Sequence, residues 1–107
     1  MTTFDERERG YEAKFIQDQN IEFRIKARRN HLLGLWAGEL LGFKGDELAL
    51  YTGTVMSSDL AEPGDDDVLR KISSDFRASK LDLSESDIRA KMEQLLAISK
   101  REVVTGE

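Results

Sequence analysis

Apolar residues recur every three or four positions along most of the chain, and no segment alternates strictly between apolar and polar residues. That spacing is typical of amphipathic helices that bury one face. Within residues 2–41 the recurring apolar positions are Ile25, Leu32, Leu33, Trp36, Ala37, Leu40 and Leu41. The pattern predicts a long first helix that ends at Gly42, because glycine tolerates the left-handed conformation found at helix C-termini.

Three further helices are predicted after Gly42. The second starts with Asp46 as its N-cap and ends at Pro63 and Gly64, and residues 65–67 cap the third. Ser84 and Asp87 resemble a capping box that starts the fourth, which frays from Val103 onward. The positions expected to be buried are Leu48, Tyr51, Val55 and Met56, then Val68, Leu69, Ile72 and Phe76, then Ile88, Met92, Leu95 and Leu96. Short connections favour antiparallel neighbours, so we predict an all-α, small four-helix bundle over residues 20–104.

Residues 1–19 do not fit this bundle. Phe4, Tyr11 and Phe15 form a narrow aromatic stripe among many charged residues. The charged positions in this segment include Asp5, Glu6, Arg7, Glu8, Arg9, Glu12 and Lys14. Isolated helices shorter than about 12–15 residues are marginal in water. We therefore expect residues 1–19, called the arm below, to be mobile and to become fully helical when a partner covers the stripe.

Two spacings on the predicted helices suggest how they pack. Gly34, Gly38 and Gly42 lie four residues apart, which predicts a surface without side chains that a neighbouring helix approaches closely. Asp66 and Arg70, like Asp67 and Lys71, stand four apart in the order that stabilises a helix.

Composition excludes several classes of protein. The chain has 107 residues, a formal net charge of −5, one His and no Cys. It therefore offers neither a disulfide framework nor a multi-histidine metal site, and its acidity argues against bulk nucleic acid as a partner. The most apolar stretch, residues 32–43, is shorter than a membrane span needs, and no secretory signal precedes it. A cytoplasmic protein without direct membrane insertion is expected.

Candidate chemistry is sparse. The basic run from Arg28 to His31 could bind a phosphate through Arg28 and Arg29, although a solvated helix face paired with carboxylates is the simpler interpretation. Residues 65–67 lack the spacing of a calcium loop, so a helix cap explains them better than a metal site. No nucleophile motif is present, and we predict no catalytic residue, no metal and no cofactor.

Several stretches carry a resemblance to a known family. They are MTTFDERE (1–8), EAKF (12–15), ARRNHLLGLWAGELLG (27–42), GDDDVLRKI (64–72) and IRAKMEQLLA (88–97). Together they resemble the zeta-type inhibitor subunit of bacterial F-type ATP synthases, a family formerly catalogued as a domain of unknown function. The resemblance implies a four-helix bundle with an N-terminal inhibitory segment. That segment would become helical as it enters a catalytic interface and contacts the alpha, beta and gamma subunits. There it would block rotation in the direction of ATP hydrolysis.

The resemblance also implies roles for the arm residues. Phe4, Tyr11 and Phe15 would be the apolar anchors, and the seven charged positions named above would fix the register. Gly10 stands where the family usually has a better helix former, which would weaken the arm helix. Gly38, in place of a usual Ala, and Pro63 are further departures. The implied location is the cytoplasmic face of the membrane, reached through the ATP synthase.

Two other classes of function remain open. One is a small-ligand bundle in which the run at Arg28 meets a nucleotide phosphate, so that ATP or ADP would change the fluorescence of Trp36. The other is a generic protein-interaction module that dimerises and has no effect on an ATPase.

Overall fold

The computed structural model describes the backbone of residues 3–58 and 65–105, with side chains over residues 21–58 and 65–104. These residues form four α-helices and no strand. The helices are α1 (Thr3–Leu40), α2 (Gly45–Ser58), α3 (Asp66–Ala78) and α4 (Glu85–Thr105). The predicted all-α four-helix architecture is thereby confirmed.

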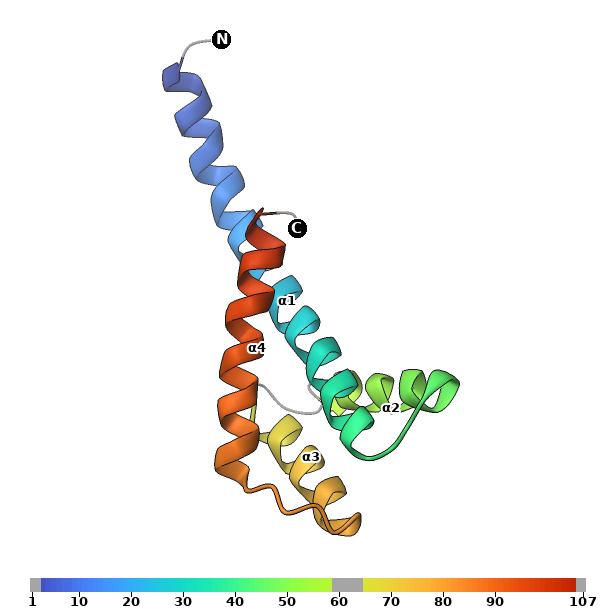
Figure 1. The fold of residues 1–107 in the computed structure, drawn as a ribbon. Coiled ribbons are helices and arrows are strands. Elements are labelled where there is room, and N and C mark those ends of the chain that lie inside the picture. The colour runs from blue at the N-terminus through green and yellow to red at the C-terminus, as the bar shows by residue number, and fades with distance from the viewer. Residues whose placement is uncertain (1–2, 59–64, 106–107) are drawn as a thin grey trace.

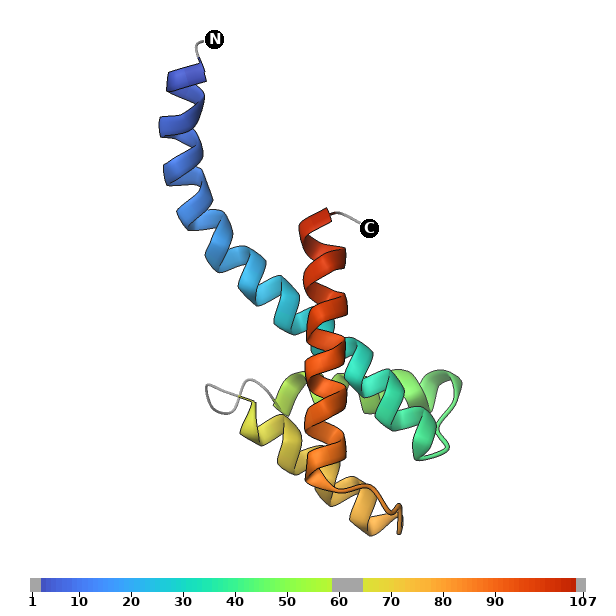
Figure 2. The same cartoon turned by 60° about the vertical axis from the view of Figure 1, so that its left-hand side comes forward.

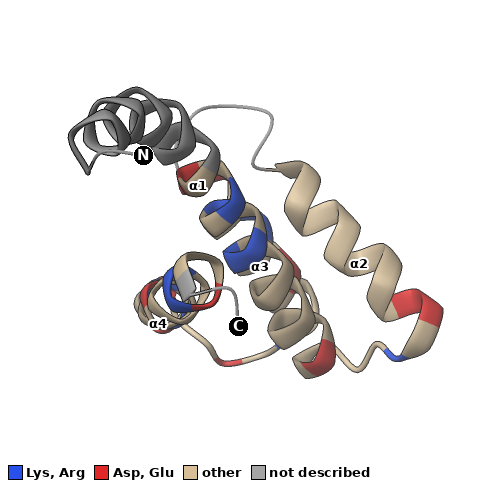
Figure 3. Cartoon of the chain, turned by 90° about the horizontal axis from the view of Figure 1, so that it is seen from above, with Lys and Arg blue, Asp and Glu red and all other residues tan. Residues whose placement is uncertain are grey.

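α1 is the central helix of the molecule. It packs along both α2 and α4, while α3 contacts α2 and α4 at the end farthest from the N-terminus. Seen from above, α2 and α4 lie on opposite sides of α1 (Figure 3). The N-terminal half of α1 continues past the end of α4, so the molecule is elongated, with extents of 61 × 26 × 22 Å (Figures 1 and 2).

The core lies where the four helices meet. Its fully buried side chains include Leu33, Val55, Ile72, Phe76 and Ile88, so each helix contributes to one apolar cluster. Trp36 is half-buried and packs edge to face on Phe76, with 5.6 Å between ring centroids. Burial of Leu40 was predicted wrongly, because it is 43% exposed while the adjacent Leu41 packs against the core. Leu40 and Leu41 point about 100° apart around the helix axis, and Leu41 is the one that faces the core.

The helix ends follow local chemistry. Gly42 has φ +91°, with the Phe43 N–H on the Gly38 carbonyl and the Gly42 N–H on the Glu39 carbonyl. This is a Schellman motif and confirms Gly42 as the end of α1.

The capping box before α4 is confirmed as well. The Ser84 N–H donates to Asp87 Oδ2, and the Asp87 N–H donates to Ser84 Oγ. Two boundary predictions are wrong, and a third is not tested. α2 begins at Gly45, which places Asp46 inside its first turn, and α4 stays helical to Thr105 instead of fraying from Val103. The predicted end at Pro63 and Gly64 lies outside the described residues.

α2 approaches α1 closely at two glycines. A Cβ on Gly34 would lie 2.9 Å from the Thr52 Cα, and one on Gly38 would lie 2.5 Å from Leu48 Cδ1. The predicted close approach is confirmed at these two positions. It is wrong at Gly42, which has no neighbour within 4 Å of such a Cβ because it has already left the helix.

The acidic residues 65–67, at the start of α3, do not make the contacts that were predicted for them. Asp65 occupies the N-cap position but makes no side-chain cap hydrogen bond. The two predicted i, i+4 pairs are also replaced: Asp67 pairs with Arg70, three residues away, and Asp66 meets Arg89 of α4 at 3.4 Å. Lys71 instead pairs with Asp75 at 3.1 Å. Asp66 therefore pairs with another helix, and Asp67 pairs within its own helix at a different spacing from the predicted one.

Candidate partner-binding site

The arm is the N-terminal part of α1. Its backbone is helical from Thr3 and runs without interruption into the part of α1 that packs in the bundle. At 3.6 residues per turn, positions 4, 11 and 15 fall within roughly 40° of one another around the helix. The ten predicted contact residues, from Phe4 to Phe15, lie outside the described side chains. The predicted helix is present, and its dependence on a partner stays a prediction.

Arg28 joins the base of the arm to the end of α4. Its Nε and Nη2 lie 3.0 and 2.9 Å from Glu102 Oε2. The arginine side chain is 43% exposed, so the pair is near the surface and contributes little net stability. The Arg28–Glu102 pair instead fixes a position, because it holds the last turns of α4 beside α1.

Arg29, by contrast, is buried, with only 1% of its side chain exposed. Its Nη2 donates to Asp65 Oδ1 at 2.7 Å, and its Nε donates to Asn30 Oδ1 at 2.8 Å. The Arg29 hydrogen bond lowers the pKa of the Asp65 carboxyl, against the opposing effect of partial burial. The interpretation of this run as a solvated face is therefore wrong for Arg29. Its guanidinium is directed to Asp65 and is not presented to an external phosphate.

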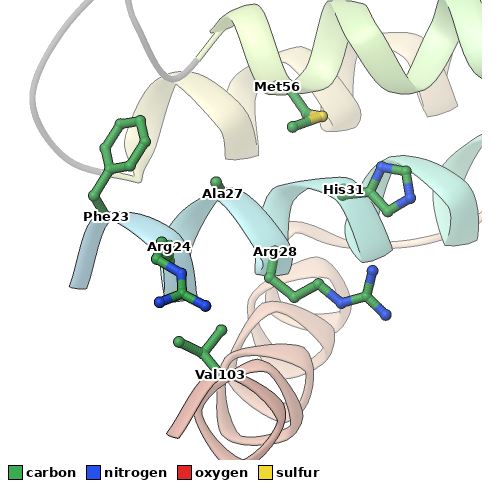
Figure 4. A pocket seen from close by; sticks show the side chains of 7 residues that line it. All are labelled: Phe23, Arg24, Ala27, Arg28, His31, Met56 and Val103. Atoms are coloured by element: carbon green, nitrogen blue, oxygen red, sulfur yellow. The ribbon is translucent and has the colours of Figure 1, made fainter. Parts of the chain in front are cut away.

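A surface hollow of about 470 Å³ lies at the base of the arm, between α1, α2 and α4 (Figure 4). We call it the arm-base hollow; its lining residues are Phe23, Arg24, Ala27, Arg28, His31, Met56 and Val103. Phe23 is 69% exposed, and none of the lining residues that the structure describes is a carboxylate. It combines apolar surface with cationic side chains, a composition suited to binding an acidic and partly apolar surface.

Sequence reasoning identified Arg28 in this hollow and missed the apolar members. Phe23 could have been found, because it is a large apolar residue outside the buried stripe of the first helix. Met56 and Val103 carry no such signal, since their position depends on how α2 and α4 cross α1.

A second polar cluster, of Tyr51, Lys71 and Asp75, lies between α2 and α3. Tyr51 Oη donates to Asp75 Oδ2 at 2.8 Å, and Lys71 Nζ donates to the same oxygen at 3.1 Å. Burial raises the pKa of the Tyr51 phenol, and the hydrogen bond to Asp75 raises it further. The phenol therefore stays protonated at neutral pH and acts as a structural link between α2 and α3.

Two kinds of feature are absent from the described residues. No group of His, Cys, Asp or Glu side chains there is placed to hold a metal ion. None of the described helices combines the length and the hydropathy needed to cross a bilayer.

Comparison with known proteins identifies the family. The family model described as ATPase inhibitor subunit zeta matches residues 1–102. No curated protein matches the chain. Among solved structures, the chain is similar to a protein determined by solution NMR, with 38% sequence identity and a TM-score of 0.70. That similarity covers 81% of this chain and 99% of the other. The chain therefore belongs to the ATPase inhibitor subunit zeta family, and it is a regulatory partner of an ATP synthase rather than an enzyme.

Proposed function

We propose that the arm, residues 1–19, inhibits ATP hydrolysis by inserting into a catalytic interface of the ATP synthase head. There it contacts the alpha, beta and gamma subunits and blocks rotation in the direction of hydrolysis. The observation that carries the proposal is the extension of α1 beyond the other three helices, which both views of the fold display (Figures 1 and 2). Membership in an inhibitor family supports the same role.

The sizes of the arm and of the four-helix body fit these different roles. A single helix is about 10–12 Å in diameter with its side chains, and the arm is about 25 Å long at 1.5 Å per residue. A helix of that size can enter a cleft between subunits that the four-helix body cannot enter. The body then remains outside and limits how far the arm inserts.

The residue types of the arm suit a protein cleft. Phe4, Tyr11 and Phe15 supply aromatic anchors, the residue class that dominates the energetics of many interfaces. The mixed charges around them can pair with charges of either sign on the partner, which favours one register over others. These assignments are proposals from helical register and residue type.

Removal of the arm tests the proposal. The full chain and a chain lacking residues 1–19 are added to purified ATP synthase from the same organism, and ATP hydrolysis is measured. Among the residues whose side chains the structure describes, every buried apolar one lies at or after Ile25, so the shortened chain is expected to fold, as circular dichroism would verify. We expect inhibition by the full chain alone. No inhibition by the full chain, or equal inhibition by both, would contradict the proposal.

Nucleotide binding is the second candidate function, with fewer residues to support it than the sequence predicted. Arg29 no longer contributes to it, and the cations that remain together are Arg24 and Arg28 in the arm-base hollow. Titration of ATP into the isolated chain, followed by Trp36 fluorescence, tests this alternative. A saturable change at micromolar ATP would support it.

A further inference from the structure

We infer that the base of the arm is a second contact surface, which binds an acidic, partly apolar surface of the ATPase at the mouth of the cleft that receives the arm. The arm-base surface consists of Phe23, Arg24 and Ala27 of α1, Met56 of α2 and Val103 of α4. The inference rests on the proposed function, because the arm determines which protein this surface faces.

The exposure of Phe23 is the first argument. A phenylalanine that is 69% exposed leaves a large apolar area in water, next to a hollow whose other apolar members are half-buried. An exposed aromatic ring beside a hollow that is itself partly apolar commonly marks a binding site.

The continuity of α1 is the second argument, and it identifies the occupant. α1 is a single helix from Thr3 to Leu40, so the positions of its residues along the axis are coupled. Phe23 follows Phe15 by eight residues, which is about 12 Å along a helix. A partner that encloses Phe15 therefore reaches the neighbourhood of Phe23, and the arm-base surface lies at the entrance of the cleft.

Charge is the third argument, and it gives the chemistry of the partner. Residues 22–31 present three exposed cations, Arg24, Lys26 and Arg28, and one exposed Glu, in a chain whose net charge is −5. The fourth cation of this segment, Arg29, is buried against Asp65 and adds no surface charge. Blue segments mark Lys and Arg along α1 in Figure 3. Arg28 is paired with Glu102 but still 43% exposed. A local positive surface of this kind favours an acidic partner surface and increases the rate of association.

The same charges disfavour a second copy of this chain as the occupant. A two-fold interface brings the same patch of both subunits together. Self-association through the arm-base surface would bring Arg24 of one copy, with the exposed Lys26 near it in the sequence, close to the same cations of the other. A different protein with carboxylates at this position avoids that repulsion.

The test uses full-length variants and the half-maximal inhibitory concentration for ATP hydrolysis. Phe23→Ala removes the exposed ring, and Arg24→Glu reverses one charge. Leu50→Ala and Lys44→Glu are matched controls, because Leu50 is 73% exposed on α2 and Lys44 is exposed between α1 and α2. We expect each arm-base variant to need roughly ten times more protein for half-maximal inhibition, while the controls match the wild type. High salt is expected to shrink the effect of Arg24→Glu, because it screens exposed charges.

The outcomes separate this inference from the proposed function. A full-length variant with Phe4, Tyr11 and Phe15 all changed to Ala is measured in parallel. Loss of inhibition by this variant, with wild-type behaviour of Phe23→Ala and Arg24→Glu, would overturn the second contact and leave the arm in place. Full inhibition by this variant would instead contradict the proposed function. A monomer–dimer equilibrium shifted by Phe23→Ala in analytical ultracentrifugation would assign the surface to a second copy and overturn the inference.

Discussion

Arg29 is a charged residue within the core, and a carboxylate at the start of α3 compensates the charge of its guanidinium. It is 1% exposed and donates to Asp65, whose side chain is 39% exposed at the start of α3. A buried charge without a partner is costly, whereas a charge with a hydrogen-bonded partner is tolerated. The pair therefore fixes the start of α3 against α1 after a connection that spans residues 59–64.

Replacement of Asp65 by Asn tests this pair. A fully buried ion pair that loses one member typically costs 3–5 kcal/mol, and the partial exposure of Asp65 reduces the expected loss to about 2 kcal/mol. The measurement is urea unfolding at pH 7, followed by circular dichroism. Asp66→Asn is the control, since Asp66 is 74% exposed and its contact to Arg89 is long at 3.4 Å. We expect a loss below about 0.5 kcal/mol for this control.

The same pair predicts a pH dependence of stability. Arg29 lowers the pKa of Asp65 in the folded state, so the folded protein binds this proton less readily than the unfolded chain does. The stabilisation is present above the ordinary pKa of about 4 and is lost as the pH falls through the lowered value. Asp65→Asn should therefore lose less stability than the wild type between pH 5 and pH 2. Equal losses for the two proteins would contradict the assignment.

Sequence reasoning at the residue scale predicted a carboxylate partner for Arg29 but placed this residue wrongly on a solvated face. Ile25, Arg29, Leu33 and Ala37 lie four residues apart and are all buried, so the spacing contained the signal that Arg29 faces inward. The identity of its partner could not be predicted, because Asp65 is 36 residues away and serves equally well as a helix cap in the sequence. Lys80 is a similar case. It has φ +60° and ends α3 where a glycine would be the usual signal.

At the scale of elements, the contact between α1 and α2 depends on the absence of side chains on one face of α1. Gly34→Ala would place a Cβ 2.9 Å from the Thr52 Cα, where the neighbour is backbone and cannot rotate away. Overpacking of this kind costs about 1–3 kcal/mol and exceeds the gain of about 0.5–1 kcal/mol from replacing glycine in a helix. We expect a net loss of stability in urea unfolding.

Gly53→Ala is the matched substitution on α2. A Cβ at Gly53 has nothing within 4 Å, so only the change in helix propensity acts there. We expect a gain of about 0.5–1 kcal/mol. A stabilising Gly34→Ala would refute the close approach of the two helices.

The arm helix gives a further prediction at this scale. Gly10 lies within α1, and its replacement by Ala should favour the helical arm by about 0.5–1 kcal/mol. If folding of the arm limits inhibition, Gly10→Ala should lower the half-maximal inhibitory concentration by about two- to fivefold. Gly53→Ala makes the same chemical change in the body and should leave inhibition unchanged. An unchanged or weaker effect of Gly10→Ala would argue against an arm limited by folding.

Elements with a complete local signal were predicted accurately. The Gly42 terminus and the capping box at Ser84 are short-range motifs, and both are present. The prediction of Asp65 as a side-chain cap failed because a tertiary partner, Arg29, takes the carboxylate. Local chemistry therefore determines a helix end only where no buried group elsewhere needs the same side chain.

At the scale of the whole molecule, one helix connects the arm, the proposed binding segment, to a folded body. Residues 1–31 are nearly balanced in charge, with seven basic and six acidic residues, whereas residues 32–107 hold nine basic and fifteen acidic ones. The arm was predictable from the sequence because it lacks enough apolar residues to pack. The arm-base hollow was not, because it exists only where α1, α2 and α4 converge.

Hydrogen–deuterium exchange of the full chain, alone and bound to purified ATP synthase under hydrolysis conditions, tests whether the chain inhibits through its arm. We expect amides of residues 3–19 to exchange fast in the isolated chain and to become strongly protected in the complex. The helices of the body should change little. Protection confined to the body, with the arm exchanging equally fast in both states, would contradict an inhibitor that acts through its arm.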